Sequence, residues 1–324
     1  MTTKLDLSPK AIAKIDIPFA SGHRLCAGCA AGTIVRQVMM ALRGPTIFVN
    51  ATGCLEVATT IYPYTAWKVP WIHVAFENAA AVASGIESAI KVMRRKGIIE
   101  DEHVDIIAFG GDGGTFDIGL QALSGALERG HDFVYIVYDN YAYQNTGIQR
   151  SGATLFGQST TTSWAGTKIP GKIQWKKPFA EIAAAHRIPY VATASPYYWQ
   201  DLVKKVRKAL EVEGPAVIHA VSSCTRGWRF PPELSIELTK VAVETLIHPL
   251  YEVFDGKEYH ITKMIKKPKP VTEFFKLQGQ FKHLLTPEWS HITKQFQERV
   301  LEDYRLLLKK AGIELPEGEP KIEA

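Results

Sequence analysis

The chain has 324 residues, 46% of them hydrophobic and 22% charged, which is typical of a globular protein with one large domain or one domain and an extension. No apolar run approaches the roughly eighteen residues of a membrane span, and residues 1–20 lack the apolar core of a signal peptide, so we expect a cytoplasmic protein with reduced cysteines and no membrane partner. The net charge of +5 is partly concentrated at 263–270 without an aromatic-interleaved stripe, which favours a solvated or partner-facing surface over a nucleic-acid site.

The middle of the chain alternates strand-like and helix-like segments. Short continuous apolar runs predict strands buried on both faces, and longer segments, two of which end in a glycine, predict helices. In chain order we predict a strand over 46–50, a helix over 78–97, a strand over 104–109, a helix over 117–130, strands over 133–138 and 188–194, a helix over 197–212 and a strand over 216–221. This alternation indicates an α/β fold with a doubly wound, mostly parallel sheet.

The C-terminal part has a different composition. Residues 263–270 are rich in lysine and proline, and a polar, helix-like tail over about 271–312 follows them. We therefore expect an α/β domain over 1–262, and a basic linker with a helical tail over 263–324.

Residues that follow the predicted strands are the first candidates for a site, because ligands of parallel sheets lie at the carboxyl ends of the strands. Cys54 follows the first strand, the turn FGGDGGTFDIG (109–119) the second, DNYAYQNTGIQRSG (139–152) the third and Cys224 the last. We expect all of these motifs to lie on one edge of the sheet.

The glycine-rich turn over 109–119 is not a dinucleotide-binding fingerprint, because Phe116 stands where the last glycine would fall, and it is not a P-loop. The simplest interpretation is a tight turn in which Asp112 or Thr115 caps the next helix. A phosphate site is the functional alternative, because Gly113 and Gly114 let backbone amides approach an anion at a helix N-terminus.

Asp112 would repel a phosphate unless a cation lay between them. Mg²⁺ suits that position, because it binds carboxylate, amide and phosphate oxygens together. Asn140 follows Gly113 after 26 intervening residues and stands at the end of the neighbouring predicted strand. Asp112 and Asn140 therefore form a candidate cation site.

Gly-Asp-Gly at 111–113 followed by Asn140 resembles the thiamine diphosphate motif, and the continuation YQNTGIQRSG (143–152) resembles the β subunits of 2-oxoacid:ferredoxin oxidoreductases. The first resemblance implies that the side chains of Asp112 and Asn140 and the carbonyl of Ala142 hold Mg²⁺ against the diphosphate. The second implies that Asn145 reaches the thiazolium and the substrate as a catalytic residue. The implied cofactor-binding set is Gly111, Asp112, Gly113, Gly114, Thr115, Asn140, Ala142, Asn145, Thr146 and Gly147.

The four cysteines, Cys26, Cys29, Cys54 and Cys224, have the spacing C-x2-C-x24-C-x169-C. Four thiolates could hold a [4Fe–4S] cluster or zinc. Zinc ribbons use two Cys-x-x-Cys pairs, a bacterial ferredoxin run is compact, and a redox pair leaves two cysteines unexplained. The spacing thus favours a cluster, while zinc and unrelated core or redox cysteines remain open.

The segments GHRLCAGC (22–29) and NATGCLE (50–56), with the later cysteine after a strand, are similar to the same β subunits. The resemblance extends over roughly 20–285 and implies that all four cysteines bind a [4Fe–4S] cluster close to thiamine. The family often has CPTGW where this chain reads CTRGW, so Arg226 could tune the cluster or contact an anion. Ala30 stands where a glycine often follows the first cysteine pair.

The resemblance implies a β subunit that takes part in oxidative decarboxylation of a 2-oxoacid with coenzyme A, giving acyl-CoA, CO₂ and reduced ferredoxin. Pyruvate is favoured, with branched-chain 2-oxoacids, 2-oxoglutarate and oxalate open. It also implies an α subunit that supplies the glutamate near the aminopyrimidine, further γ and ferredoxin-like subunits, and no activity of this chain alone. A non-redox thiamine decarboxylase or carboligase and a zinc-bound structural subunit are the alternatives.

The remaining polar and aromatic residues near these motifs have simpler interpretations. We expect structural or interface roles for Glu56 and Glu77, and packing or hydrogen-bonding roles for His23 and His73. The aromatic residues of the loop after 60 are expected to pack at a subunit interface; they are Tyr62, Tyr64, Trp67 and Trp71.

Overall fold

The computed structural model describes residues 5–100 and 102–314. Within these residues, an eight-stranded sheet has the order β2-β1-β3-β4-β6-β5-β7-β8. The first six strands of this order pair in parallel, and β7 and β8 are added antiparallel at one edge. The strands are β1 (Thr46–Ala51), β2 (Trp71–Val74), β3 (Asp105–Gly111), β4 (Val134–Asp139), β5 (Tyr190–Ala194), β6 (Ala216–Val221), β7 (Leu250–Phe254) and β8 (Glu258–Lys263).

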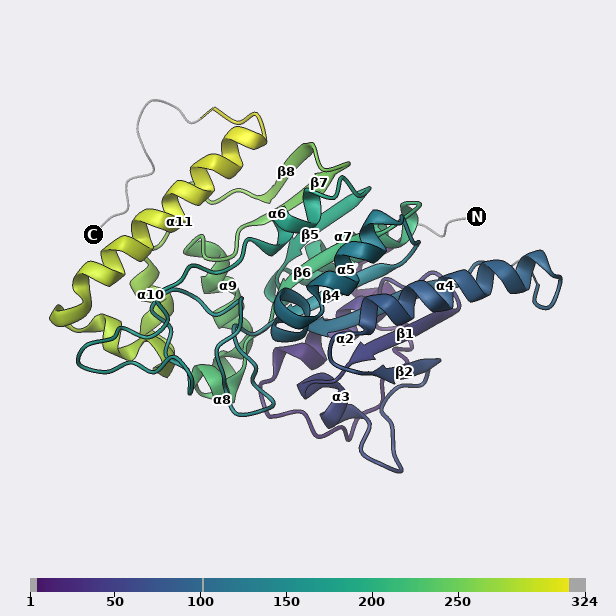
Figure 1. Ribbon diagram of the computed structural model, residues 1–324, viewed down its shortest axis with the longest axis horizontal. Coiled ribbons are helices and arrows are strands. Elements are labelled where there is room, and N and C mark those ends of the chain that lie inside the picture. Colours follow the sequence, from purple (N-terminus) through teal and green to yellow (C-terminus); the bar gives the residue numbers. More distant parts are fainter. Residues whose placement is uncertain (1–4, 101, 315–324) are drawn as a thin grey trace.

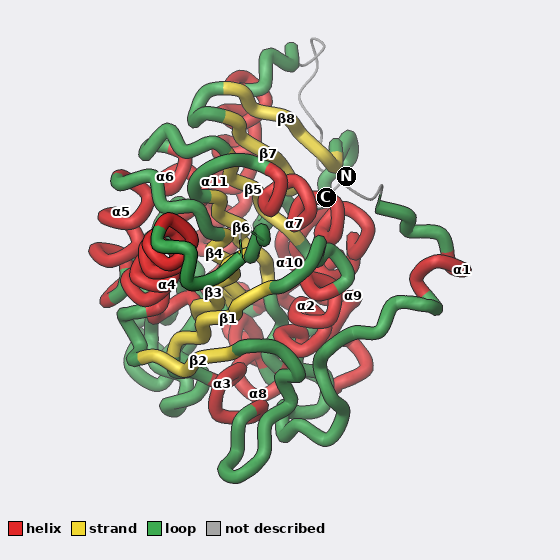
Figure 2. Tube along the Cα trace, turned by 90° about the vertical axis from the view of Figure 1, so that its right-hand side faces the viewer, coloured by secondary structure: helices red, strands yellow, loops and turns green. Residues whose placement is uncertain are grey.

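Helices cover both faces of the sheet (Figure 2). One face packs against α4 (Ala79–Arg95), α5 (Leu120–Glu128), α6 (Phe179–Ala184) and the long α11 (Ser290–Lys310). The other packs against α2 (Ala30–Met39) and α7 (Trp199–Glu211). The shorter helices are α1 (Pro9–Ile12), α3 (Cys54–Thr59), α8 (Thr225–Trp228), α9 (Ser235–Glu244) and α10 (Val271–Lys276). None of the described helices is long and apolar enough to cross a membrane.

The predicted fold class is confirmed, and each predicted strand agrees with an observed one to within two residues. Strands β3, β4 and β6 are buried along nearly their whole length, as continuous apolar runs require. Strands β2, β7 and β8 were not predicted. The outer strand β8 alternates exposed and half-buried residues, so it carries no continuous apolar run.

The structure differs from three further expectations. Trp67 was expected in an interface loop, and this is wrong, because its ring is buried in the core against Phe48 and Phe109. The predicted tail helix is interrupted: α10 and α11 are separated by two 3₁₀ turns over 279–289. The expected domain boundary at 262 falls inside β8, and α11 contributes Tyr304 and Leu307 to the core below the sheet.

Four parallel strands position the candidate site. In the described sheet, β1, β3, β4 and β6 lie side by side in the same direction, with Gly111 paired to Tyr138 and Asp139 to Val221. Their carboxyl ends therefore form one edge. Figure 1 places α3 and α8, which follow β1 and β6, at the same end of the molecule.

Candidate cofactor site

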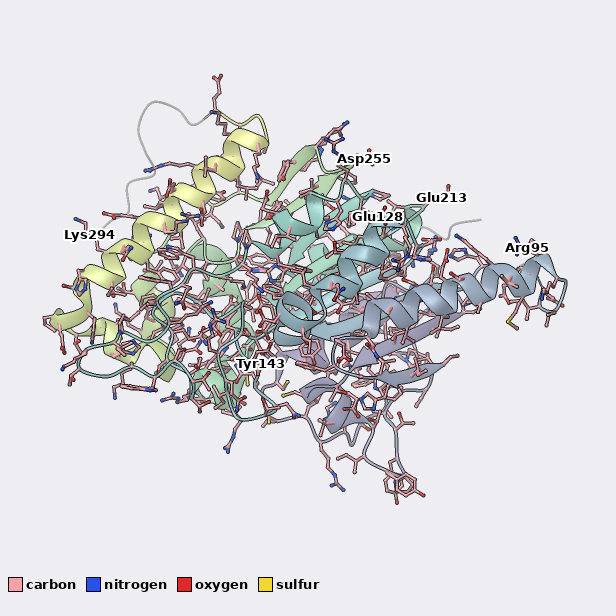
Figure 3. The ribbon with its side chains drawn as sticks, viewed as in Figure 1. Arg95, Glu128, Tyr143, Glu213, Asp255 and Lys294 are labelled. Carbon is pink, nitrogen blue, oxygen red and sulfur yellow. The ribbon has the colours of Figure 1, made fainter. Side chains whose placement is uncertain are left out.

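The turn after β3 is closed around glycines. A Cβ added at Gly113 would overlap the ring of Tyr143, and one at Gly114 would lie 2.9 Å from the carbonyl oxygen of Phe76. The Tyr143 hydroxyl also donates a hydrogen bond to Asp117 Oδ2 at 2.9 Å. Figure 3 labels Tyr143 in the lower middle of the view, away from Arg95 at the end of α4 on the right. Close packing thus fixes the backbone of this turn.

Three oxygen-bearing groups meet next to this turn. The end of the Asn140 amide lies 2.9 Å from Asp112 Oδ1 and 2.9 Å from the Ala142 carbonyl oxygen. With nitrogen in that position the amide donates to both; with oxygen there, three acceptors converge and need a cation between them. Adjacent ligands of an octahedral Mg²⁺ site, with bonds of 2.0–2.1 Å, are also about 2.9 Å apart. The donor set therefore fits such an ion.

The two buried carboxylates of the region differ in their partners. Asp139 is completely buried; burial acts to raise its pKa, but Lys176 and His219 outweigh burial and hold the pKa well below its usual range. Asp112 is 1% exposed and accepts a hydrogen bond from Ser151 Oγ at 2.5 Å. Burial and the nearby Asp139 raise its pKa well above the usual range. A cation at Asp112 would relieve this cost.

The cysteines reach the same edge from three parts of the chain. Cys54 opens α3 directly after β1, and Cys224 caps the N-terminus of α8 after β6. Cys26 and Cys29 precede α2, and the Ala30 N–H donates to the Ser223 carbonyl at 3.2 Å, which brings the pair beside Cys224. Cys26 is exposed, whereas the other three are half-buried.

The thiols influence one another and receive backbone N–H groups. Burial, together with the neighbouring Cys224, Cys29 and Cys26, raises the pKa of Cys54 to about 12. Burial raises the pKa of Cys29 to about 11, opposed by the backbone N–H of Ala31. The Gly227 N–H points at Cys224 Sγ, 3.4 Å away. Such N–H groups suit cluster thiolates. Among the described residues, however, no three His, Cys, Asp or Glu side chains are gathered closely enough to hold a metal ion.

A cavity of about 170 Å³ is lined by the oxygen groups and by Cys54. Its lining brings together most of the predicted residues with several unpredicted ones: Thr52, Gly53, Cys54, Phe76, Gly111, Asp112, Gly113, Gly114, Tyr138, Asn140, Ala142, Tyr143, Gln144, Asn145 and Thr146. Pockets that enclose a drug-sized ligand measure roughly 300–1,000 Å³. This cavity is smaller and does not by itself enclose such a ligand.

Two residues of the predicted cofactor-binding set do not line this cavity, and neither do Cys26, Cys29 and Cys224. Thr115 is buried and shares a hydrogen bond with the Tyr135 hydroxyl at 3.1 Å, and Gly147 lies beyond the lining turn with φ of 118°. Tyr143 and Gln144 lie inside the YQNTG stretch and could have been included from the sequence. Ser151 could not, because its contact with Asp112 joins residues 39 positions apart.

The residues near the motifs for which we expected structural or interface roles lie as follows. His73 shares a hydrogen bond with Thr52 Oγ1 at 2.6 Å and lies 3.6 Å from Glu56. The ring of His23 packs against Phe19. Tyr62 and Tyr64 are 94% and 75% exposed, and Arg226 is also exposed.

The fold and the arrangement of these groups define a thiamine diphosphate-binding module. Residues 51–220 match the family model described as thiamine pyrophosphate enzyme, C-terminal TPP binding domain. A chain of the 2-oxoglutarate:ferredoxin oxidoreductase from Magnetococcus marinus shares the fold, with a TM-score of 0.53 and 20% identity over 70% of this chain and 81% of that chain.

Comparison with curated sequences shows to which family of thiamine diphosphate-binding proteins the chain belongs. The chain is 55% identical over 282 residues to pyruvate synthase subunit PorB of Methanocaldococcus jannaschii, covering 87% of this chain and 94% of the relative. It is 51% identical over 301 residues to PorB of Thermotoga maritima (91% and 92%). It is 42% identical over 305 residues to ketoisovalerate oxidoreductase subunit VorB of Pyrococcus furiosus (93% and 96%). The chain belongs to the PorB family of β subunits of 2-oxoacid:ferredoxin oxidoreductases.

Proposed function

We propose that the chain is the cofactor-binding β subunit of a cytoplasmic pyruvate synthase, which decarboxylates pyruvate oxidatively with coenzyme A and delivers electrons to ferredoxin. The observation that carries the proposal is the shared cavity, which is lined both by Asp112, Asn140 and Ala142 and by Cys54. Thiamine diphosphate, which would carry the decarboxylation, and an iron–sulfur cluster, which would accept the electrons, could therefore be bound next to each other. Identity of about half to the PorB relatives supports pyruvate.

Mg²⁺ and the diphosphate of thiamine would be held at the turn after β3. The Asp112 carboxylate, the Asn140 amide oxygen and the Ala142 carbonyl would bind Mg²⁺, while backbone N–H groups of the 111–115 turn would face the phosphates. Asn145 and Thr146 line the cavity beyond these groups, where Asn145 would orient the thiazolium and the substrate. When bound, thiamine diphosphate supplies the decarboxylation chemistry, and a [4Fe–4S] cluster supplies one-electron transfer.

Cys26, Cys29, Cys54 and Cys224 would bind the cluster. This assignment is supported by their positions at the ends of β1 and β6 and in the loop before α2, along one edge of the sheet. Backbone N–H groups directed at Cys29 and Cys224 would stabilise thiolates there, and exposed Arg226 could contribute positive charge nearby.

The rest of the site would come from partner chains. We assign the glutamate near the aminopyrimidine, and part of the substrate contacts, to an α subunit, since the cavity of this chain is smaller than a full ligand site. Ferredoxin-like and γ subunits would complete the complex, with ferredoxin as the acceptor. Specificity for a branched-chain 2-oxoacid is the second candidate, because the VorB relative is 42% identical over nearly the whole chain.

The test is anaerobic purification of the complete complex, followed by analysis of iron, acid-labile sulfide, zinc and thiamine diphosphate, and by electron paramagnetic resonance after reduction. About four irons and four sulfides per cluster in this chain, with a reducible signal that Cys224→Ser removes, support the proposal. Zinc in place of iron indicates the structural alternative, and thiamine without either metal indicates a non-redox decarboxylase or carboligase. Turnover with pyruvate, branched-chain 2-oxoacids, 2-oxoglutarate and oxalate then identifies the substrate; oxalate would require no coenzyme A.

A further inference from the structure

The side chain of Trp228 connects the cation site at Asp112 and Asn140 with the helix that follows Cys224. The main-chain carbonyl of Asn140 accepts hydrogen bonds from Trp228 Nε1 at 2.8 Å and from Gln144 Nε2 at 2.7 Å. Trp228 is completely buried and is the last residue of α8, the four-residue helix that Cys224 caps. The residue that contacts the cation-site turn therefore lies on the same helical turn as a candidate cluster ligand.

The turn that Trp228 contacts has an unusual backbone. Tyr141 has φ of 65°, in the left-handed region that bulky residues rarely adopt. Its ring stacks on Trp228 with centroids 4.9 Å apart and planes 7° apart, and its carbonyl accepts a hydrogen bond from Thr154 Oγ1 at 2.7 Å. Such a conformation persists only where surrounding contacts enforce it. These contacts hold the Ala142 carbonyl where it meets the Asn140 amide.

Gln144 fills the space between the same two regions. Its Oε1 is buried without a hydrogen-bond partner in the described structure, and a Cβ added at Gly227 would overlap this atom. The Gly227 N–H in turn points at Cys224 Sγ. A displacement of α8 must therefore move Gln144 as well as Trp228. Both side chains donate hydrogen bonds to the Asn140 carbonyl, so the displacement also reaches the turn at Asn140.

We propose that Trp228 and Gln144 are positioning residues that couple the cysteine site to the cation site. A cluster bound at the cysteines fixes α8, and α8 then holds the strained Asn140–Ala142 turn in the conformation that binds Mg²⁺ and thiamine diphosphate. The inference rests on the proposed function. Because coupling between two binding sites is reciprocal, thiamine diphosphate must also strengthen retention of the cluster. One neutral hydrogen bond corresponds to a factor of about two to ten in affinity.

The test uses the purified complex, kept anaerobic, with its cluster and after removal of the cluster by an iron chelator. Titration calorimetry gives the dissociation constant of thiamine diphosphate with Mg²⁺ in both states. The quantity compared is the ratio of the dissociation constant without the cluster to the dissociation constant with it. We expect this ratio to be about two to ten in the unaltered complex. In Trp228→Phe, which keeps a ring but loses the N–H donor, we expect it to be close to one. Gln144→Met removes the second donor to the Asn140 carbonyl at a half-buried position. We expect it to lower the ratio, but not to one.

Trp289→Phe is the matched control, because Trp289 is also buried but lies in the C-terminal region; it should keep the unaltered ratio. A merely structural role for Trp228 predicts lower thermal stability with the same ratio, and that result would overturn the coupling. So would a ratio of one in the unaltered complex. Failure to bind thiamine diphosphate or to contain a cluster overturns the proposed function itself, together with the coupling. If Trp228→Phe does not fold, the ratio in Gln144→Met decides.

Discussion

The oxygen groups of the cation site and the sulfur groups of the cysteine site lie along one edge of the sheet, yet the chain holds them differently. Asp112 and Asn140 follow the adjacent strands β3 and β4, are buried, and are already in contact. Cys54 and Cys224 follow β1 and β6, which β3 and β4 separate, and the Cys26–Cys29 pair follows no strand.

This difference shows what a sheet can fix by itself. Hydrogen bonds between neighbouring strands set the spacing of groups at their ends, so the oxygen set needs only short turns to be complete. The sulfur set depends on loops and on short helices, and within the described residues its side chains do not form a ready metal cage. We infer that the cation site is preformed, whereas the cysteine site takes its final geometry when its cofactor binds.

The largest expected effect comes from Asp112→Ala. We expect affinity for Mg²⁺ with thiamine diphosphate to fall by more than about 100-fold, beyond the 10–100-fold typical of outer-shell partners. Most of the iron should remain, because loss of the coupling weakens retention of the cluster by no more than about tenfold. The thermal unfolding temperature of the cofactor-free complex should not fall, because the variant removes a buried carboxylate whose ionisation burial opposes. Calorimetric titration, iron analysis and thermal unfolding measure these outcomes; loss of most of the iron as well would mean that the variant disrupts the fold rather than the cation site alone.

The reverse experiment is Cys54→Ala. We expect most of the cluster iron and sulfide to be lost, because Cys54 is one of the four proposed ligands and the remaining three are not gathered without a cofactor. Binding of thiamine diphosphate should persist, weakened by no more than the coupling factor of about ten. Val57→Ala, on the exposed side of the same helix α3, is the matched control. A complete cluster in Cys54→Ala would remove this cysteine from the ligand set.

The sequence predicts the preformed cation site better than the cysteine site. Strands β3, β4 and β6 are read from continuous apolar runs, and the ends of parallel strands share an edge, so the sequence alone is enough to predict that Asp112, Asn140 and Cys224 lie together. The relation of Cys26 and Cys29 to the other cysteines came from the number and spacing of the cysteines and from motif resemblance, because a loop of this kind has no periodicity from which its path could be inferred.

What the sequence does not show are contacts between residues that follow different strands. Nothing local indicates that Ser151 supports Asp112, or that Trp228 donates to the Asn140 carbonyl across 88 positions. Lys176 beside Asp139 is equally hidden, because it comes from a long irregular segment. Such contacts depend on how loops close over the sheet, and loop closure is decided by packing between distant segments.

Ser151→Ala should give a moderate effect confined to the oxygen set. The hydroxyl donates to Asp112 Oδ2, so its loss leaves one carboxylate oxygen without this donor and frees the side chain to rotate. We expect affinity for Mg²⁺ with thiamine diphosphate to fall about 10-fold or more, in the range of outer-shell partners, with unchanged iron. Ser195→Ala, which removes another buried serine that donates to a backbone carbonyl, should leave this affinity unaltered. Equal losses in both variants would mean that general destabilisation is responsible.

The smallest expected effect concerns Lys172, which supports the same loop. Its buried ammonium donates to the Thr154 carbonyl at 2.5 Å, and burial lowers its pKa to about 7 from the usual 10.5. Between these two pH values the unfolded chain binds more protons than the folded chain, so this group makes stability rise with pH. Thermal unfolding of the complex from pH 7 to 9 should therefore show a shallower rise in Lys172→Met, with unchanged iron content. An unchanged rise in Lys172→Met would mean that Lys172 is protonated in the folded protein, and that the loop supporting Asp112 is held by charge rather than by a neutral amine.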